Sequence, residues 1–161
     1  MTISIKDLTA ADVMTSDVLM AYEGWSIKRL SSFFIKNGIS GAPVIASDHT
    51  LVGVVTVTDI INFETKTDKE KSDLVEEVYA EFVGYNFESD MINQMAVKAD
   101  EKCTVNKVMT EQVIQIDETA PLSQVSKVML DAGIRRIFVS NNGVVCGVIS
   151  TTNILKAISL L

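Results

Sequence analysis

The sequence contains the same unit twice, and this duplication limits the possible folds more than any other feature. Three segments recur at an offset of 95 residues, which falls to 94 after a one-residue deletion in a turn. The matching pairs are Val13-Met14-Thr15 with Val108-Met109-Thr110, Gly38-Ile39 with Gly133-Ile134, and 53–60 with 147–154. The copies lie near 8–63 and 103–158, so the fold must itself be built from a repeated unit.

Each copy shows the hydrophobic pattern of the same elements in the same order. A short strand (18–22 or 113–116) precedes an apolar-periodic helix that ends at a glycine, Gly38 or Gly133. Two apolar strands joined by a tight turn follow, and then a last helix. One small sheet with helices on one face cannot bury both of its faces. The order β-α-β-β-α, present twice, therefore predicts an α/β fold of the α+β type, with the repeats packed as a pseudo-twofold module.

A spacer breaks the pattern and divides the chain into 1–63, 64–102 and 103–161. The spacer holds 11 Asp/Glu against 5 Lys/Arg and so carries most of the net charge of −7. An apolar stripe at helical spacing predicts one helix ending at Gly84, and a second helix is expected after Ser89. The stripe consists of Leu74, Val75, Val78, Tyr79, Phe82 and Val83. We interpret the spacer as an acidic helical insertion with a solvated face rather than as a cation site.

Composition and charge exclude several classes of function. A net charge of −7 with a pI near 4.7 argues against a nucleic-acid-binding surface, which needs clustered Lys and Arg. No apolar run approaches the length of a membrane span, and the N-terminus lacks the pattern of a signal peptide, so we expect a cytoplasmic protein without membrane contact. A single histidine, His49, and two isolated cysteines leave no metal site and no nucleophile with a base. We therefore expect neither an enzyme nor a resident metal or cofactor.

The repeated unit resembles the CBS domain, named after cystathionine β-synthase. The resemblance rests on Val-Met-Thr before the first strand, the segment 38–44 ahead of the second, and Gly-x-x-Thr/Ser-x-x-Asp/Asn before the last helix. It implies a tandem pair that binds an adenosine-containing ligand, such as AMP, ADP, ATP or S-adenosylmethionine, in clefts between the sheets. It also implies a regulatory role without chemistry, and frequent dimerisation.

The resemblance also implies ligand-binding residues. Asp59 matches the acid that accepts bonds from the ribose hydroxyls, and Thr56 matches the hydroxyl that contacts phosphate at a helix N-terminus. The adenine-binding segment corresponds to Gly41, Ala42, Pro43 and Val44, with Thr15 and Val18 near the opposite wall. In the second copy the corresponding positions are Ser150, Asn153, Thr110 and Val113.

Differences between the copies leave alternatives open. Asn153 replaces the acid and offers one acceptor oxygen, which predicts that ribose binding there is weaker or differently oriented. Arg135 and Arg136 fit a phosphate, or they are surface charges paired with a neighbouring acid. Thr56 with Asp59, and Ser150 with Asn153, also fit a capping box that only satisfies the helix N-terminus.

Two functional hypotheses follow. The first is a stand-alone module that binds an adenosine ligand and signals to a regulated protein that the sequence does not identify. The second is a ligand-free scaffold whose spacer helix docks a partner. In either case we expect a homodimer, because a monomer of 161 residues is not expected to cover its apolar helix faces, which include Ile27, Phe34, Leu122 and Met129.

Overall fold

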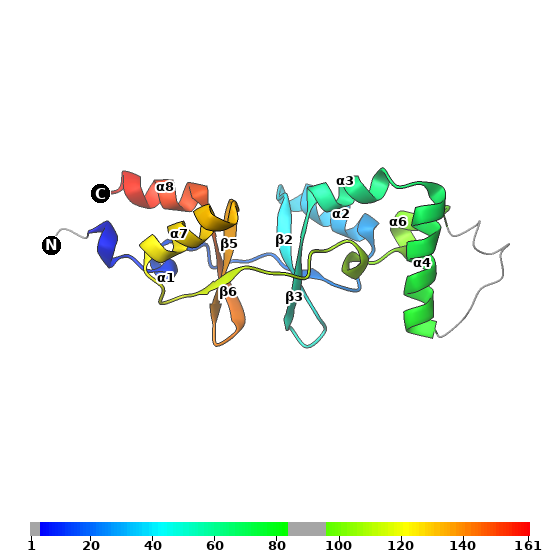
Figure 1. Ribbon diagram of the computed structural model, residues 1–161, viewed down its shortest axis with the longest axis horizontal. Helices are drawn as coiled ribbons and strands as arrows, with labels where there is room; N and C mark the ends of the chain where they lie inside the picture. Colours follow the sequence, from blue (N-terminus) through cyan, green and yellow to red (C-terminus); the bar gives the residue numbers. More distant parts are fainter. Residues whose placement is uncertain (1–3, 84–95) are drawn as a thin grey trace. The chain divides into compact units, whose positions relative to one another are not determined.

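The strands form two three-stranded sheets of identical topology (Figure 1). The computed structural model describes residues 4–83 and 96–161. One sheet contains β1 (Ala21–Tyr22), β2 (Gly41–Ile45) and β3 (Leu51–Thr56), and the other contains β4 (Gln115–Asp117), β5 (Arg136–Asn141) and β6 (Val144–Ser150). In each sheet the first strand is parallel to the second, and the second is antiparallel to the third.

The register of the two sheets shows that the sequence repeat is a structural repeat. Ala21 pairs with Val44, and Ile116 pairs with Val139. Each partner in the second pair lies 95 residues beyond its counterpart in the first. The predicted α/β class and the element order of each repeat are confirmed. The first strands are shorter and begin later than predicted: β1 begins at Ala21 and β4 at Gln115.

Helices follow the strands at matching positions in both repeats. α2 (Ile27–Asn37) and α7 (Leu122–Ala132) end at Gly38 and Gly133, whose φ values of 61° and 64° lie in the left-handed region that favours glycine. α3 (Val57–Glu64) follows β3, and α8 (Thr151–Ser159) follows β6. None of the helices that the structure describes is both long and apolar enough to cross a membrane.

The chain forms two compact units that cut across the repeats of the sequence. Unit 1 consists of Met1–Leu19 with Val113–Leu161, and unit 2 of Met20–Gln112. Unit 1 thus contains η1 (Ile5–Asp7) and α1 (Ala10–Val13), whereas unit 2 contains α6 (Ala99–Lys102) and η2 (Val105–Lys107). The first part of each sequence repeat therefore belongs to the unit that contains the other repeat's sheet, and we call these parts, 8–19 and 103–112, the leading segments.

Backbone hydrogen bonds hold each leading segment on its sheet. In unit 1, Thr15 N donates to Val148 O over 2.9 Å and Val148 N donates to Thr15 O over 3.0 Å. In unit 2, Val54 and Thr110 exchange the same two bonds, both 2.9 Å long. A glycine on the strand leaves room for this approach: a Cβ added to Gly53 would lie 2.7 Å from Met109 Sδ and 2.9 Å from Thr110 O.

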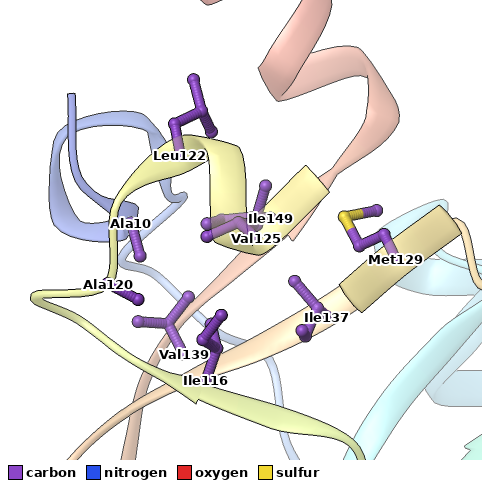
Figure 2. Packing of buried hydrophobic residues seen from close by; sticks show 9 residues of the cluster. All are labelled: Ala10, Ile116, Ala120, Leu122, Val125, Met129, Ile137, Val139 and Ile149. Carbon is purple, nitrogen blue, oxygen red and sulfur yellow. The ribbon is translucent and has the colours of Figure 1, made fainter. Parts of the chain in front are cut away.

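Each unit has its own hydrophobic core. In unit 1, side chains from α1, α7 and the β4-β5-β6 sheet converge (Figure 2). In unit 2, one cluster lies between α2 and the β1-β2-β3 sheet, and a second contains Ile27, Phe63 and Cys103. The helix residues on which the sequence argument for a dimer depended are buried inside these cores, so that ground for a dimer is wrong. They are Ile27, Phe34, Leu122 and Met129, all at most 3% exposed.

The spacer contributes α4 (Asp68–Val83), which packs against α6 in unit 2 (Figure 1). Val75 is fully buried and Val78 is 8% exposed, and Leu74 and Tyr79 pack at the edge of the same cluster. On its outer side, α4 is held by Lys107, whose Nζ lies 3.5 Å from Glu77 Oε2 and also contacts Glu81 Oε1. The side chains of residues 82 and 83, and the second spacer helix expected after Ser89, lie outside the described residues.

Candidate functional site

A capping box positions the proposed ribose-binding acid in unit 2. Thr56 is the N-cap of α3, and its backbone N–H donates to Asp59 Oδ2 over 2.8 Å. The Thr56 hydroxyl donates to the same oxygen over 3.3 Å. Among the described residues, Asp59 Oδ1 accepts no hydrogen bond, and the side chain is half-buried. The capping box is therefore present, and it uses only one of the two carboxylate oxygens.

The corresponding box in unit 1 engages both polar atoms of its amide. Ser150 donates to Asn153 Oδ1 through its backbone N at 2.8 Å and its hydroxyl at 2.7 Å. Asn153 Nδ2 donates to Thr15 Oγ1 over 3.3 Å. Asp59 and Asn153 thus begin their helices in the same way but offer a ligand different chemistry, because only Asp59 keeps an uncommitted acceptor.

Each leading segment lies on the sheet of the other repeat, so each candidate threonine lies near the candidate residues of the other repeat. Thr15 belongs to the leading segment of the first repeat yet lies beside Asn153 and β6 of the second. Thr110 belongs to the leading segment of the second repeat yet pairs with Val54 of β3 in the first, two residues before the strand end at Thr56. Taken as consecutive blocks, the two copies place Thr15 with Asp59 rather than with Asn153. No pattern along the chain signals that the leading segments cross over.

The proposed adenine-binding segment forms β2. Ala42 and Val44 are buried in a unit 2 core, and Pro43 is also buried. Gly41 is half-buried and pairs with Thr56 across the sheet, so its backbone lies beside the N-terminus of α3. The side chains of Ala42, Pro43 and Val44 are therefore buried in unit 2, and within this segment only Gly41 is partly accessible.

Arginine replaces glycine at the corresponding place in unit 1. Arg136 pairs with Ser150 across β5 and β6, and it is exposed beside the N-terminus of α8. Arg135 is also exposed, and its carbonyl accepts a hydrogen bond from Thr151 N over 3.1 Å. Within the part of the chain that the structure describes, neither arginine forms an ion pair. The surface ion-pair interpretation of these two arginines is therefore not supported.

The two valines of the candidate set differ from the threonines in lacking a polar side chain. Val18 is half-buried at the end of the unit 1 leading segment, and Val113 is half-buried at the start of the second stretch of unit 1. Both can contribute only apolar contact to a ligand. In the described residues, no group of three or more His, Cys, Asp or Glu side chains is arranged to hold a metal ion.

Comparisons with known proteins match both repeats. The family model described as "CBS domain" matches residues 10–66 and 105–160. The uncharacterized protein MJ1426 of Methanocaldococcus jannaschii is 26% identical over 156 residues, which cover 91% of this chain and 89% of that protein.

Solved structures show the same fold. CBSX2 of Arabidopsis thaliana in complex with AMP has a TM-score of 0.68 at 19% identity, covering 94% of this chain and 96% of that one. The CBS domain pair of protein MJ0100, in complex with 5-methylthioadenosine and S-adenosyl-L-methionine, has a TM-score of 0.64 at 20% identity with the same coverage. At 20% and 19% identity, the two structures establish the fold of this chain but not its ligand.

Proposed function

Since the chain belongs to the CBS domain family, we propose that it is a regulatory module that binds an adenosine-containing ligand and performs no chemistry of its own. CBSX2 is described in complex with AMP, and the MJ0100 domain pair with S-adenosyl-L-methionine and 5-methylthioadenosine. All three ligands carry an adenosine group. We propose that this chain also binds the adenosine group. The candidates for the complete ligand are AMP, ADP, ATP and S-adenosylmethionine.

The observation that carries the proposal is the uncommitted oxygen of Asp59. The Thr56 N–H fixes Oδ2 at 2.8 Å, so the carboxylate is held in place before a ligand arrives. Oδ2 already accepts two bonds from Thr56, so the two lone pairs of Oδ1 are the ones that accept bonds from the neighbouring ribose hydroxyls. The first N–H groups of α3 and its dipole favour an anion at the same end of the helix. Ribose and phosphate are thus both accommodated near Thr56.

The two units should bind the ligand unequally. Asn153 has its oxygen engaged by Ser150 and its amide by Thr15, so ribose binding in unit 1 requires breaking an existing bond. Arg136 offers a guanidinium beside the same helix end, which suits a phosphate. We therefore propose that unit 2 recognises the nucleoside and that unit 1 responds mainly to the number of phosphates.

The test compares two variants by titration calorimetry with AMP, ATP and S-adenosylmethionine. Asp59→Asn is the sharper variant, because Asn153 shows that an asparagine caps the helix in this setting. It removes charge-assisted bonds worth about 1.5 to 3 kcal/mol, so affinity should fall roughly ten- to a hundredfold with little change in the unfolding midpoint. Arg136→Gln should weaken ATP more than AMP, and the difference should shrink in high salt. Unchanged affinity in both variants would reject the site.

We further propose that the module is a homodimer that signals to a regulated protein. Exposed apolar residues repeat at corresponding positions of the two copies, which favours a shared assembly surface. They are Ile35 with Leu130, exposed by 82% and 81%, and Ile61 with Leu155, exposed by 55% and 65%. A light-scattering mass of one chain at micromolar concentration would reject the dimer. Val75 and Val78 of the α4 stripe are buried, so these described residues do not favour the alternative of a ligand-free scaffold that uses this helix as its docking surface.

A further inference from the structure

Among residues 4–83 and 96–161, no helix of unit 1 corresponds to α4, which covers part of unit 2. In unit 2, Cys103 and Phe63 are 0% and 1% exposed because α4 packs beside them. At the offsets of the repeat, their counterparts in unit 1 are Leu8 and Ala157, which are only half-buried. The backbone confirms that the places are equivalent: Ile27 N donates to Cys103 O over 3.1 Å, and Leu122 N donates to Leu8 O over 2.9 Å.

More apolar surface continues this face of unit 1. Ile5 is 36% exposed and Ile158 is 48% exposed. Ile158 occupies the position of Glu64. In unit 2, Glu64 Oε2 lies 3.7 Å from Nζ of Lys71 on α4. We define the unit 1 face as Ile5, Leu8, Asp12, Ala157 and Ile158. A helix seated on it would need an apolar residue where α4 carries Lys71.

The charge at the edge of the face is reversed between the units. In unit 2, Lys107 holds Glu77 and Glu81 of α4. The residue at the position of Lys107 in unit 1 is Asp12. Its Oδ2 accepts from Thr9 N over 2.8 Å, and this backbone bond lowers the pKa of Asp12, so the group is ionised at neutral pH. Basic residues on an incoming helix would complement it.

We propose that the unit 1 face binds an amphipathic helix of a partner protein, with an apolar stripe like that of α4 and with Lys or Arg where α4 has Glu77 and Glu81. The second unit of the same chain provides the template: there, a 16-residue helix fills the equivalent place. This proposal is independent of the ligand site, because none of its five residues takes part in either capping box that carries a candidate ligand residue.

The probe is a labelled peptide of residues 68–83 carrying Lys71→Leu, Glu77→Lys and Glu81→Lys. Titrated into the full chain and followed by NMR, it should shift the signals of Leu8 and Ala157 in a saturable way. Ala157→Glu should weaken binding at least tenfold, by placing a charge in the apolar seat. Asp12→Asn keeps an acceptor for the Thr9 cap and should weaken binding several-fold, with loss of its salt dependence. Val144→Glu, a matched change at a 64% exposed residue of unit 1 outside the face, should leave the affinity unchanged.

Three results would overturn the proposal. The first is the absence of any shift up to about 1 mM peptide, the range of the weakest specific contacts. The second is a set of shifts centred on Cys103 and Phe63, which would mean that the peptide only exchanges with α4. The third is a dimer that Ala157→Glu converts to a monomer without any peptide binding, which would make a second copy the occupant. Circular dichroism melting of each variant establishes that a lost interaction is not lost folding.

Discussion

Replacing Gly53 by Ala should loosen the segment that crosses β3. The added Cβ would lie 2.9 Å from Thr110 O and 2.7 Å from Met109 Sδ. The thioether can move, but the carbonyl is fixed by the bond that it accepts from Val54 N. Losing the two bonds between Val54 and Thr110 costs about 1 to 3 kcal/mol, and the forced shift of Met109 adds about 1 kcal/mol. The free energy of unfolding should therefore fall by about 2 to 4 kcal/mol.

Urea unfolding followed by the fluorescence of Trp25, the single tryptophan, measures the free energy of unfolding of unit 2, which contains the substitution. Trp25 belongs to unit 2, and its carbonyl accepts a bond from Val105 N in the same segment. Gly24→Ala is the matched control, because a Cβ there would meet nothing within 4 Å and the effect on the unfolded chain is the same. Equal midpoints for Gly53→Ala and Gly24→Ala would refute the reasoning.

A double variant separates the side-chain clash from the backbone clash. Met109→Ala removes the thioether but not the carbonyl of Thr110. Combined with Gly53→Ala, it should recover only about 1 kcal/mol of the loss, so the two effects are not additive. Full recovery would show that the glycine is needed only for the methionine and not for the backbone approach.

Three further predictions concern the cluster under α4. Phe63→Ala removes a side chain that is 1% exposed and should cost about 3 to 5 kcal/mol, measured by the Trp25 unfolding midpoint; a loss below about 1 kcal/mol would mean that α4 does not rest on this ring. Burial raises the pKa of the Cys103 thiol from 9.0 to about 11. The unfolded thiol ionises first, so stability should fall as the pH rises from 9.0 towards 11, and Cys103→Ala should lack that part of the fall. Lys107→Met should cost at most about 1 kcal/mol and only at low salt, because its two acidic partners are more than half exposed; a loss that persists in high salt would indicate packing rather than charge.

Much of the fold could be predicted because the duplication displays each pattern twice. The glycines that end α2 and α7 stand at the same offset as the strands that follow them, so each copy supports the reading of the other. The helix α4 could be predicted equally well, because Val75 and Val78 are apolar residues at helical spacing and both are buried. The short first strands were harder to place, because two or three residues carry no periodicity. The pseudo-twofold packing of the repeats and the boundaries at 63/64 and 102/103 stay predictions.

The candidate site could be predicted only in part. Its chemistry is local: Thr56 and Asp59 lie three residues apart, and the capping geometry follows from that spacing. The partner of Asn153 could not be found this way, because Thr15 is 138 residues distant in the chain. The burial of Ala42 and Val44 was likewise hidden, since a uniformly apolar strand does not show which atoms face a core and which face a ligand.

The exchange of leading segments also sets an order of folding. Unit 2 is one continuous stretch, Met20–Gln112, and needs nothing from the rest of the chain to close. Unit 1 must bring Met1–Leu19 back to Val113–Leu161 across that whole stretch. Closing so long a loop is slow while it is unfolded, and it becomes easier once the intervening chain has collapsed. Because Val113–Leu161 follows unit 2 in the chain, Met1–Leu19 can complete unit 1 only after all of unit 2 has been synthesised.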